Sequence, residues 1–262
     1  MLKVRNISVR YDKTFVLQEL DTEFKTGRLT ALIGPNGCGK STLLKAMMDF
    51  LPLETGEVLL NDHNIRKLSR KQMAREMAYL PQECQCPDYM TVGELVELAG
   101  YARYAFGSGP SKRDRELFAD ALATVGLADQ ASQQVNKLSG GQRQRAWIAM
   151  VLAQNTNLVL LDEPVNHLDM KYQYAVLDLV KKLCRERGKT VIVVLHDLNL
   201  AAAFADEVLM MNAGRIIAKG STDTTITDHN VRSTFGLDAD IFNHNGRLVC
   251  LPCEIAGETV LS

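Results

Sequence analysis

Residues 34–41 carry the residue types and the spacing that most directly indicate chemistry, because they read G-P-N-G-C-G-K-S. The pattern G-x-x-x-x-G-K-S is typical of a phosphate-binding loop, whose glycines let backbone N–H groups curl around phosphate oxygens. Lys40 would bring a positive charge to the outer phosphates of a nucleotide, and the Ser41 hydroxyl could bind Mg²⁺. A plain glycine-rich turn is the alternative. The motif follows an apolar run and precedes a helical pattern, however, as a phosphate loop requires.

A pair of acidic residues ends the apolar run 158–161, where the sequence continues with Asp162 and Glu163. Ligands of open α/β sheets bind at the carboxyl ends of the strands, so Asp162 is placed to hold Mg²⁺ through water. Glu163 follows at a position where a carboxylate could polarise a water for attack on a phosphate. Without the phosphate loop, the same pair would be interpreted as the start of a solvated loop.

A second candidate anion site lies at residues 138–142, which read L-S-G-G-Q directly before a helical pattern. Ser139 and two glycines at this point would expose N–H groups at a helix N-terminus, and such groups attract anions. Taken alone, the segment is an ordinary helix cap. In a chain that already has a phosphate loop, however, this second segment distinguishes one family of phosphate-loop proteins from the others.

The elements that would position these residues follow from the hydrophobic pattern. The runs 29–33, 158–161 and 191–195 are short and almost continuously apolar, which is typical of strands buried on both faces of a parallel sheet. Helical patterns cover residues 40–48, 111–125, 140–153 and 171–187. Alternating strands and helices predict an α/β fold.

Two regions depart from this alternation. Near the N-terminus apolar residues alternate with polar ones, which predicts a half-buried antiparallel strand with the apolar side chains on one face. Residues 83–154 contain helical patterns but no clear buried strand, so we interpret them as a helical insertion with a polar loop at 107–111. The apolar residues of the N-terminal strand are Leu2, Val4, Ile7, Val9 and Tyr11.

The composition is that of an ordinary globular protein, with 46% hydrophobic and 23% charged residues. The net charge of −1 creates no strong field toward nucleic acid or an anionic bilayer, so we expect neither as a direct partner. The first residues lack the apolar segment of a signal peptide, and no apolar run reaches the roughly 18 residues needed to span a membrane. Any membrane association is therefore expected to come through a partner.

Six cysteines are scattered along the chain. Cys84 with Cys86, and Cys250 with Cys253, have spacings that a redox or metal pair could use. Reduced thiols without such a role are the alternative. We favour it because neither pair lies in a recognisable metal-binding or redox context. The remaining cysteines are Cys38 and Cys184.

The motifs together resemble those of the ATP-binding subunits of ABC transporters, over the segment from Tyr11 to about Gly220. Besides the phosphate loop and the L-S-G-G-Q signature, shorter motifs match in the family's order. Tyr11 matches the aromatic residue that stacks on adenine, with Val16 nearby. Gln82 matches the glutamine that contacts Mg²⁺ and the attacking water and senses the permease, and His196 matches the switch histidine on the γ-phosphate.

The resemblance implies a P-loop NTPase (RecA-like) core with an N-terminal antiparallel β-subdomain and an inserted α-helical subdomain. Two identical subunits would form a head-to-tail dimer, in which the signature of one covers the ATP bound by the other. Residues 166–169 would form the D-loop, which communicates across that dimer. ATP and Mg²⁺ are the implied cofactors.

The resemblance also implies a role for each matching residue. The catalytic residues would be Glu163, His196 and Gln82. The Mg²⁺ ligands would be Ser41, Gln82 and Asp162. The residues that contact ATP would be Tyr11, Val16, Gly34, Pro35, Asn36, Gly37, Cys38, Gly39, Lys40, Ser41, Thr42, Ser139, Gly140, Gly141, Gln142 and Asp169.

The partners implied by the resemblance are a multi-span membrane permease and, indirectly, a substrate-binding protein. The subunit would lie at the cytoplasmic face of the inner membrane. The helical insertion and residues 83–91 are the expected docking region for the permease.

Finer similarity concerns the cargo. Residues 34–44, 143–154, 194–206 and 234–237 look like those of importers of iron–siderophore complexes. Residues 165–167 depart from that pattern, because they read V-N-H where siderophore relatives often have T-T-Y. Importers of haem or cobalamin are the alternative within the family.

Two other classes of protein would share these motifs. A soluble ABC protein without a permease would carry long coiled coils or two ATPase halves, whereas this chain has one phosphate loop and no sustained heptads. A nucleotide-binding regulator without hydrolysis would lack some of the residues expected for hydrolysis, and all are present here. We therefore predict an ABC ATPase domain at 1–225 with its helical insertion at about 83–154. A short C-terminal extension at 226–262 is expected to pack on the same domain.

Overall fold

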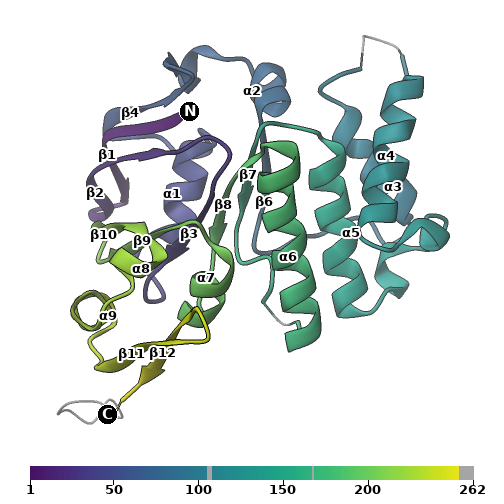
Figure 1. Ribbon diagram of the computed structural model, residues 1–262. Coiled ribbons are helices and arrows are strands. Elements are labelled where there is room, and N and C mark those ends of the chain that lie inside the picture. The colour runs from purple at the N-terminus through teal and green to yellow at the C-terminus, as the bar shows by residue number, and fades with distance from the viewer. Residues whose placement is uncertain (105–107, 167, 254–262) are drawn as a thin grey trace. The chain divides into compact units, whose positions relative to one another are not determined.

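The computed structural model describes residues 1–104, 108–166 and 168–253 (Figure 1). The chain divides into two compact units: a first unit made of Met1–Ile65 and Ile192–Ser262, and a second unit made of Arg66–Val191. Parts of three predicted segments lie outside the described residues. They are Gly107 of the polar loop, His167 of the D-loop and residues 254–262 of the C-terminal extension.

The first unit begins with an antiparallel sheet in the order β2-β1-β4-β5. As predicted, the apolar side chains of β1 from Leu2 to Val9 are buried. The prediction that Tyr11 shares their face is wrong, since its side chain is 45% exposed. The register of β1 against β2 shifts between Val9 and Arg10. Such a shift moves the side chains that follow it to the opposite face of the sheet. The strands are β1 (Leu2–Tyr11), β2 (Thr14–Phe24), β4 (Thr55–Leu60) and β5 (His63–Asn64).

A second set of strands in the first unit carries the phosphate loop. Strand β3 (Leu29–Ile33) pairs in parallel with β9 (Glu207–Asn212), which pairs antiparallel with β10 (Arg215–Ser221). Every residue of β3 is buried, which confirms the predicted strand at 29–33. The chain leaves β3 through the phosphate loop and enters α1 (Lys40–Met47), so one buried strand and one helix hold the two ends of that loop.

The C-terminal part of the first unit packs a hairpin against a short helix. The side-chain amide of Asn199 donates to the Cys250 carbonyl (3.1 Å) and accepts from the Cys250 N–H (2.8 Å). These bonds connect β12 to α7. The domain boundary predicted near residue 225 stays a prediction. The elements are α7 (Leu198–Phe204), α8 (Thr222–Thr225), α9 (Asp228–Phe235), β11 (Ala239–His244) and β12 (Arg247–Pro252).

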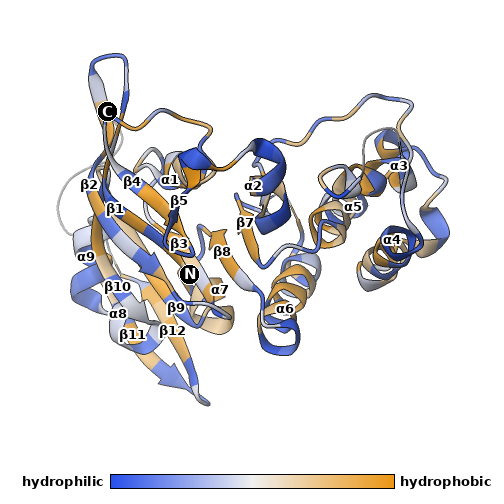
Figure 2. Cartoon of the chain, turned by 90° about the horizontal axis from the view of Figure 1, so that it is seen from above, coloured by the Kyte–Doolittle hydropathy of each residue, from blue (hydrophilic) through white to orange (hydrophobic). Residues whose placement is uncertain are grey.

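In the second unit, β6 (Met77–Leu80) pairs in parallel with β7 (Leu158–Leu161). The run 158–161 is thereby confirmed as a buried strand, whereas β6 was not expected. Strand β8 (Thr190–Val194) crosses the boundary between the units, is fully buried, and begins one residue earlier than predicted. β3, β7 and β8 are coloured as strongly hydrophobic in Figure 2, as strands covered on both faces must be.

Helices are the main regular elements of the second unit. The predicted helices at 111–125, 140–153 and 171–187 are confirmed with ends within about one residue. Ser111 caps the first of them in a capping box with Asp114. The helices are α2 (Arg70–Glu76), α3 (Val92–Glu97), α4 (Lys112–Thr124), α5 (Gly140–Ala153) and α6 (Met170–Arg187). The 3₁₀ turns among the described residues are η1 (Ile65–Lys67), η2 (Leu98–Gly100), η3 (Ala128–Gln130) and η4 (Val135–Lys137). Within the described ranges, no helix combines the length and the hydropathy needed to cross a bilayer.

Candidate active site

The phosphate loop is shaped by close backbone approaches that only glycine permits. A Cβ atom on Gly34 would lie 2.1 Å from the Met211 carbonyl oxygen, far inside van der Waals contact. Gly39 has a φ of +105°, and a Cβ atom there would lie 2.7 Å from a methyl group of Leu17. Glycine at these two positions therefore permits the tight curvature of the loop.

Lys40 is buried inside the loop that it belongs to. Its ammonium group donates to the carbonyl oxygens of Gly34 (2.7 Å) and Pro35 (2.9 Å). The N-cap residue of α1 is Gly39, which has no side chain to satisfy the first N–H groups of the helix. A cationic side chain beside uncapped helical N–H groups is suited to the phosphates of a nucleotide.

Backbone hydrogen bonds fix the loop to two neighbouring segments of the first unit. The Cys38 carbonyl accepts from the Gly214 N–H (3.0 Å), and the Gly214 carbonyl accepts from the Gln18 N–H (3.0 Å). The Cys38 thiol is buried, and burial raises its pKa above the usual value of a thiol. The loop is thus held by the turn between β9 and β10 and, through it, by β2.

The residues predicted to contact adenine lie on the surface of the first unit. Tyr11 is exposed, and Val16 is half-buried with its carbonyl oxygen 3.0 Å from the Cβ position at Gly39. The exposed Phe15 lies between them in sequence and stacks under the Arg10 guanidinium at 5.8 Å. Sequence reasoning missed Phe15 as a second exposed aromatic side chain here, because the apolar residues 15–17 are consecutive and do not indicate which of them is exposed.

His196 is exposed in the first unit, two residues beyond the end of β8. The next residue, Asp197, is the N-cap of α7 and accepts from the N–H groups of Asn199 (2.7 Å) and Leu200 (3.2 Å). A buried strand on one side and a capped helix on the other thus fix the backbone on both sides of the predicted switch histidine.

The acidic pair after β7 has an unusual backbone. Glu163 adopts a φ of +53°, in the left-handed region where a residue with a Cβ costs about 1–3 kcal/mol. Its side chain is only 9% exposed, and its Oε2 atom accepts from Gln82 Nε2 (2.7 Å) and from Asn166 Nδ2. The predicted Gln82 and Glu163 are thus brought together. The contact of Asn166 was missed, although its spacing of three residues from Glu163 was a possible signal.

Asp162 is more deeply buried than its neighbour. Its N–H donates to the Leu80 carbonyl (2.9 Å), and its Oδ2 atom accepts from the Tyr79 hydroxyl (3.3 Å). Burial, followed by the nearby Asp162 carboxylate, raises the pKa of Tyr79 well above its ordinary value, so Tyr79 stays a hydrogen-bond donor. Both contacts come from β6, which positions this carboxylate.

The signature segment forms the start of α5. Ser139 is the N-cap: its hydroxyl accepts from the Gln142 N–H (3.3 Å), and the Gln142 side chain accepts from the Ser139 N–H (2.9 Å). Ser139 and Gly140 are exposed, and a Cβ atom on Gly140 would meet nothing within 4 Å. At Gly141 the nearest atoms would be 3.6 Å away or more, so the atoms of the described residues leave room for a side chain at both positions.

Asp169 caps a helix in the same unit. It is the N-cap of α6, and its Oδ1 atom accepts from the Tyr172 N–H (3.1 Å). The structure therefore gives Asp169 a capping role, whereas its predicted contact with a nucleotide stays a prediction.

The ABC transporter family model matches residues 17–166, which is more than half of the chain. The chain belongs to the ABC transporter family. The petrobactin import ATP-binding protein FpuD of Bacillus anthracis is 40% identical to it, over 96% of this chain and 93% of the relative. The iron(3+)-hydroxamate import ATP-binding protein FhuC of Bacillus subtilis is 39% identical, over 97% of this chain and 95% of the relative.

Solved structures of the family agree with this assignment. A dimeric ATP-binding cassette in a post-hydrolysis state, bound to ADP and Pi, matches with a TM-score of 0.76 and 29% identity. The match covers 85% of this chain and 99% of the other. The fold of this ABC protein is therefore a P-loop NTPase core with a β-subdomain and helices, and the chain is an ATPase of that family.

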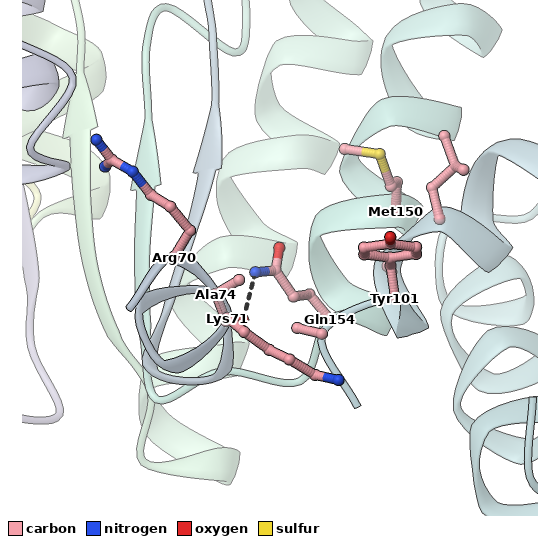
Figure 3. Close-up of a pocket in the computed structure, with 9 residues that line it drawn as sticks. Arg70, Lys71, Ala74, Tyr101, Met150 and Gln154 are labelled. Atoms are coloured by element: carbon pink, nitrogen blue, oxygen red, sulfur yellow. Dashed lines mark hydrogen bonds between the residues drawn. The ribbon is translucent and has the colours of Figure 1, made fainter. Parts of the chain in front are cut away.

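The helical part of the ABC chain carries an open groove of about 520 Å³ (Figure 3). The Gln154 side chain lines it and donates to the Ala74 carbonyl (2.7 Å). Leu98 and Tyr101 line the groove and are 52% and 78% exposed, so two large side chains offer apolar surface at the same groove. Further lining residues include Arg70, Lys71 and Met150.

The six cysteines of this ABC protein are all free of disulfide bonds. In the described part of the chain, no three or more Cys, His, Asp or Glu side chains converge as metal ligands would. A nucleotide-bound Mg²⁺ needs fewer protein ligands than that, because phosphates and water complete its shell. The buried carboxylate of Asp162 and the hydroxyl of Ser41 are hard oxygen donors that fit this ion.

Proposed function

We propose that this chain is the ATP-hydrolysing subunit that powers an ABC importer of iron–siderophore complexes. The observation that most supports ATP hydrolysis is the environment of Glu163. Its carboxylate is nearly buried, its backbone is held in a strained conformation, and the amides of Gln82 and Asn166 donate to it. Such strain persists only where the surroundings enforce it, and it is common at active sites.

The phosphate loop would bind ATP. Lys40 would exchange its bonds to the loop carbonyls for bonds to phosphate oxygens, and the N–H groups at the start of α1 would bind further oxygens. Tyr11 would stack on the adenine, with Val16 beside it. Bound Mg²⁺, held by Ser41, Gln82 and Asp162, would neutralise charge on the phosphates.

Glu163 would be the general base for hydrolysis. Its carboxylate would accept a proton from the attacking water while Gln82 orients that water. His196 would donate to the γ-phosphate. In this arrangement Asn166 would keep the Glu163 carboxylate in place, because it donates to the same oxygen as Gln82.

The signature segment would act on the ATP of a second copy of the chain. Ser139 and Gly140 are exposed at the N-terminus of α5, and the space above Gly140 is open. A helix N-terminus attracts phosphate, and a glycine that its own chain does not require permits close approach by another molecule. We infer a homodimer that closes on ATP and reopens after hydrolysis.

The groove beside Tyr101 would receive a helix of the membrane permease. Leu98 and Tyr101 offer exposed apolar contact, and Tyr89, in the predicted docking segment 83–91, is 75% exposed as well. Arg70 and Lys71 at the groove would complement an acidic side chain on that helix. The subunit would thus lie at the cytoplasmic face of the inner membrane, with a substrate-binding protein delivering cargo from the other side.

The first test replaces the proposed base. Glu163→Gln is expected to bind Mg-ATP and form an ATP-dependent dimer, while ATP turnover falls by about 100-fold or more. Glu186→Gln, an exposed position on α6, serves as the control and should keep normal turnover. Phosphate release and size-exclusion chromatography with ATP measure both effects. Turnover in Glu163→Gln equal to the unmodified chain would refute this role of Glu163.

The second test addresses the cargo. The names of the relatives refer to petrobactin and to iron(3+)-hydroxamate, which supports an iron chelate. A strain that lacks this gene should lose uptake of radiolabelled ferric siderophores and recover it with the unmodified gene but not with Glu163→Gln. Loss of haem or cobalamin uptake alone would assign the importer to those cargoes instead.

A further inference from the structure

A pocket of about 290 Å³ in the second unit takes no part in the proposed nucleotide chemistry. Its size is near the lower end of small-molecule sites, which are about 300–1,000 Å³. The lining carries two thiols, Cys84 and Cys86, from the loop that follows β6. It also carries a carboxylate and nitrogen donors, from Asp88, Arg143 and Trp147.

The Trp147 side chain forms part of the pocket wall. It is 8% exposed, and its Nε1 atom is buried with almost no solvent-accessible surface. A ligand in the open pocket would therefore contact the indole ring, so the fluorescence of Trp147 should report on such a ligand.

The charged groups indicate what kind of ligand fits. The Arg143 guanidinium is held by one bond to the Asn136 carbonyl (3.3 Å), and a guanidinium has five N–H donors, enough to bind a carboxylate as well. Asp88 at the same pocket suits an ammonium group. A small molecule with a carboxylate, an ammonium group and sulfur chemistry would match all of these neighbours.

The two thiols differ in their surroundings. The Cys84 thiol donates to the Pro81 carbonyl (3.3 Å), which engages its proton within the loop. Cys86 is half-buried at the pocket wall, so its sulfur is reachable from the pocket. Of the pair, Cys86 is therefore the thiol that a small molecule in the pocket would meet.

We propose that this pocket is a modification site, at which Cys86 forms a mixed disulfide with a small aminothiol that carries a carboxylate. The thiolate of Cys86 attacks the symmetrical disulfide of that aminothiol. A bond forms between Cys86 Sγ and one sulfur while the disulfide bond of the small molecule breaks. The released sulfur leaves as a thiolate and takes up the proton that Cys86 gave up. The small disulfide is thus the oxidant, and excess thiol reverses the reaction.

The modification has a consequence for ATP turnover that rests on the proposed function. Cys86 lies four residues after Gln82 on the same loop, and Gln82 donates to Glu163 (2.7 Å). An adduct bound by Arg143 would connect this loop to α5, because Arg143 lies in that helix. We expect the modified subunit to hydrolyse ATP more slowly, because Gln82 can no longer move freely with the attacking water.

Trp147 can serve as an intrinsic fluorescence probe of the pocket, because it is the single tryptophan of the protein. The full chain is incubated with glutathione disulfide, followed by tryptophan fluorescence, and mapped by peptide mass spectrometry. We expect one glutathione on Cys86, attached about tenfold faster than on the exposed Cys253, with a matching fluorescence change. Dithiothreitol should reverse both. Cys86→Ser should abolish the adduct and the fluorescence change, and Cys84→Ser should retain them.

One variant separates a built site from a merely accessible thiol. Arg143→Gln removes the positive charge at an exposed position. It should slow modification of Cys86 about fivefold to tenfold and leave Cys253 unaffected. Equal rates at Cys86 and Cys253, or a rate in Arg143→Gln equal to that of the unmodified chain, would overturn the proposal. Specific modification without any change in ATP turnover would overturn only its link to hydrolysis.

Discussion

Two helices of this protein begin with glycine-rich segments that suit anions, yet their N-termini are satisfied in different ways. At α1 the N-cap is Gly39 in a left-handed conformation, and a buried Lys40 fills the loop before it. At α5 the N-cap Ser139 forms a capping box with Gln142, so the helix start is already stabilised by its own side chains. The first segment is uncapped and enclosed, whereas the second is capped and exposed.

The glycines show the same contrast. Neighbouring atoms of the same unit leave no room for a side chain at Gly34 or Gly39, but they leave open space at Gly140. A glycine required by its own chain shapes a loop, and a glycine that the chain does not require permits another molecule to approach. The difference fits the proposed dimer, in which the first site is built within one chain and the second acts on the nucleotide of another.

The largest expected effect comes from Gly39→Ala. The new Cβ atom would meet Leu17 at 2.7 Å, and the φ of +105° is unfavourable for alanine, so the loop must distort. We expect ATP affinity to fall by about 100-fold or more, measured by titration calorimetry. ATP affinity within a factor of about two of normal would contradict the view that this glycine shapes the loop.

The next effect tests the exposed site. Ser139→Arg should leave ATP binding by the separate subunit intact but prevent the ATP-dependent dimer, because a long charged side chain would occupy the exposed helix start. Loss of the cap should lower the free energy of unfolding by about 1 kcal/mol. Size-exclusion chromatography in the Glu163→Gln background measures dimer formation, with Ser132→Arg, another exposed serine, as the control. Normal dimer formation in Ser139→Arg would refute the role of the signature.

A smaller change sharpens the same comparison. Gly140→Ala should keep the free energy of unfolding unchanged or raise it by up to about 1 kcal/mol, because alanine favours a helix and the site has room. The affinity of the ATP-dependent dimer should nevertheless fall. Gly188→Ala, at a φ of +63° after α6, should instead destabilise the fold by about 1 kcal/mol. Thermal unfolding measures both variants, and a large loss of stability in Gly140→Ala would contradict the comparison.

The smallest effect concerns the acidic site of the second unit. Asn166→Ala removes one of the two amide donors to Glu163, and Gln82 still holds the carboxylate. A hydrogen bond of about 1 kcal/mol corresponds to a decrease in ATP turnover of about fivefold. Steady-state phosphate release measures it. A loss as large as that of Glu163→Gln would mean that Asn166 acts in the reaction itself.

Several elements could be predicted because their signal is local. The strand at 29–33 is continuously apolar, the phosphate loop has a fixed spacing, and Ser111 and Ser139 begin helices as capping residues do. Each of these depends on a few adjacent residues. The hairpin of β11 and β12 was missed because most of its side chains are polar or exposed, and the bonds that hold it come from Asn199, far away in sequence.

The contacts at the acidic site could not be predicted for a related reason. Glu163 has a positive φ, and glutamate has no particular preference for such a conformation. The sequence therefore does not predict the turn that brings Asn166 close to Glu163. The bond from Tyr79 to Asp162 depends on the parallel pairing of β6 with β7, and β6 itself was not identified. Residue types were readable from the sequence, whereas these partners depend on tertiary pairing.

The position of Lys40 has a further consequence for how ATP binds. Because its ammonium group is bonded to the Gly34 and Pro35 carbonyls, the loop itself fixes the position of this buried side chain. A side chain that is already ordered and out of water loses little conformational entropy when it binds a phosphate. We expect calorimetry of ATP binding to show a small entropic penalty.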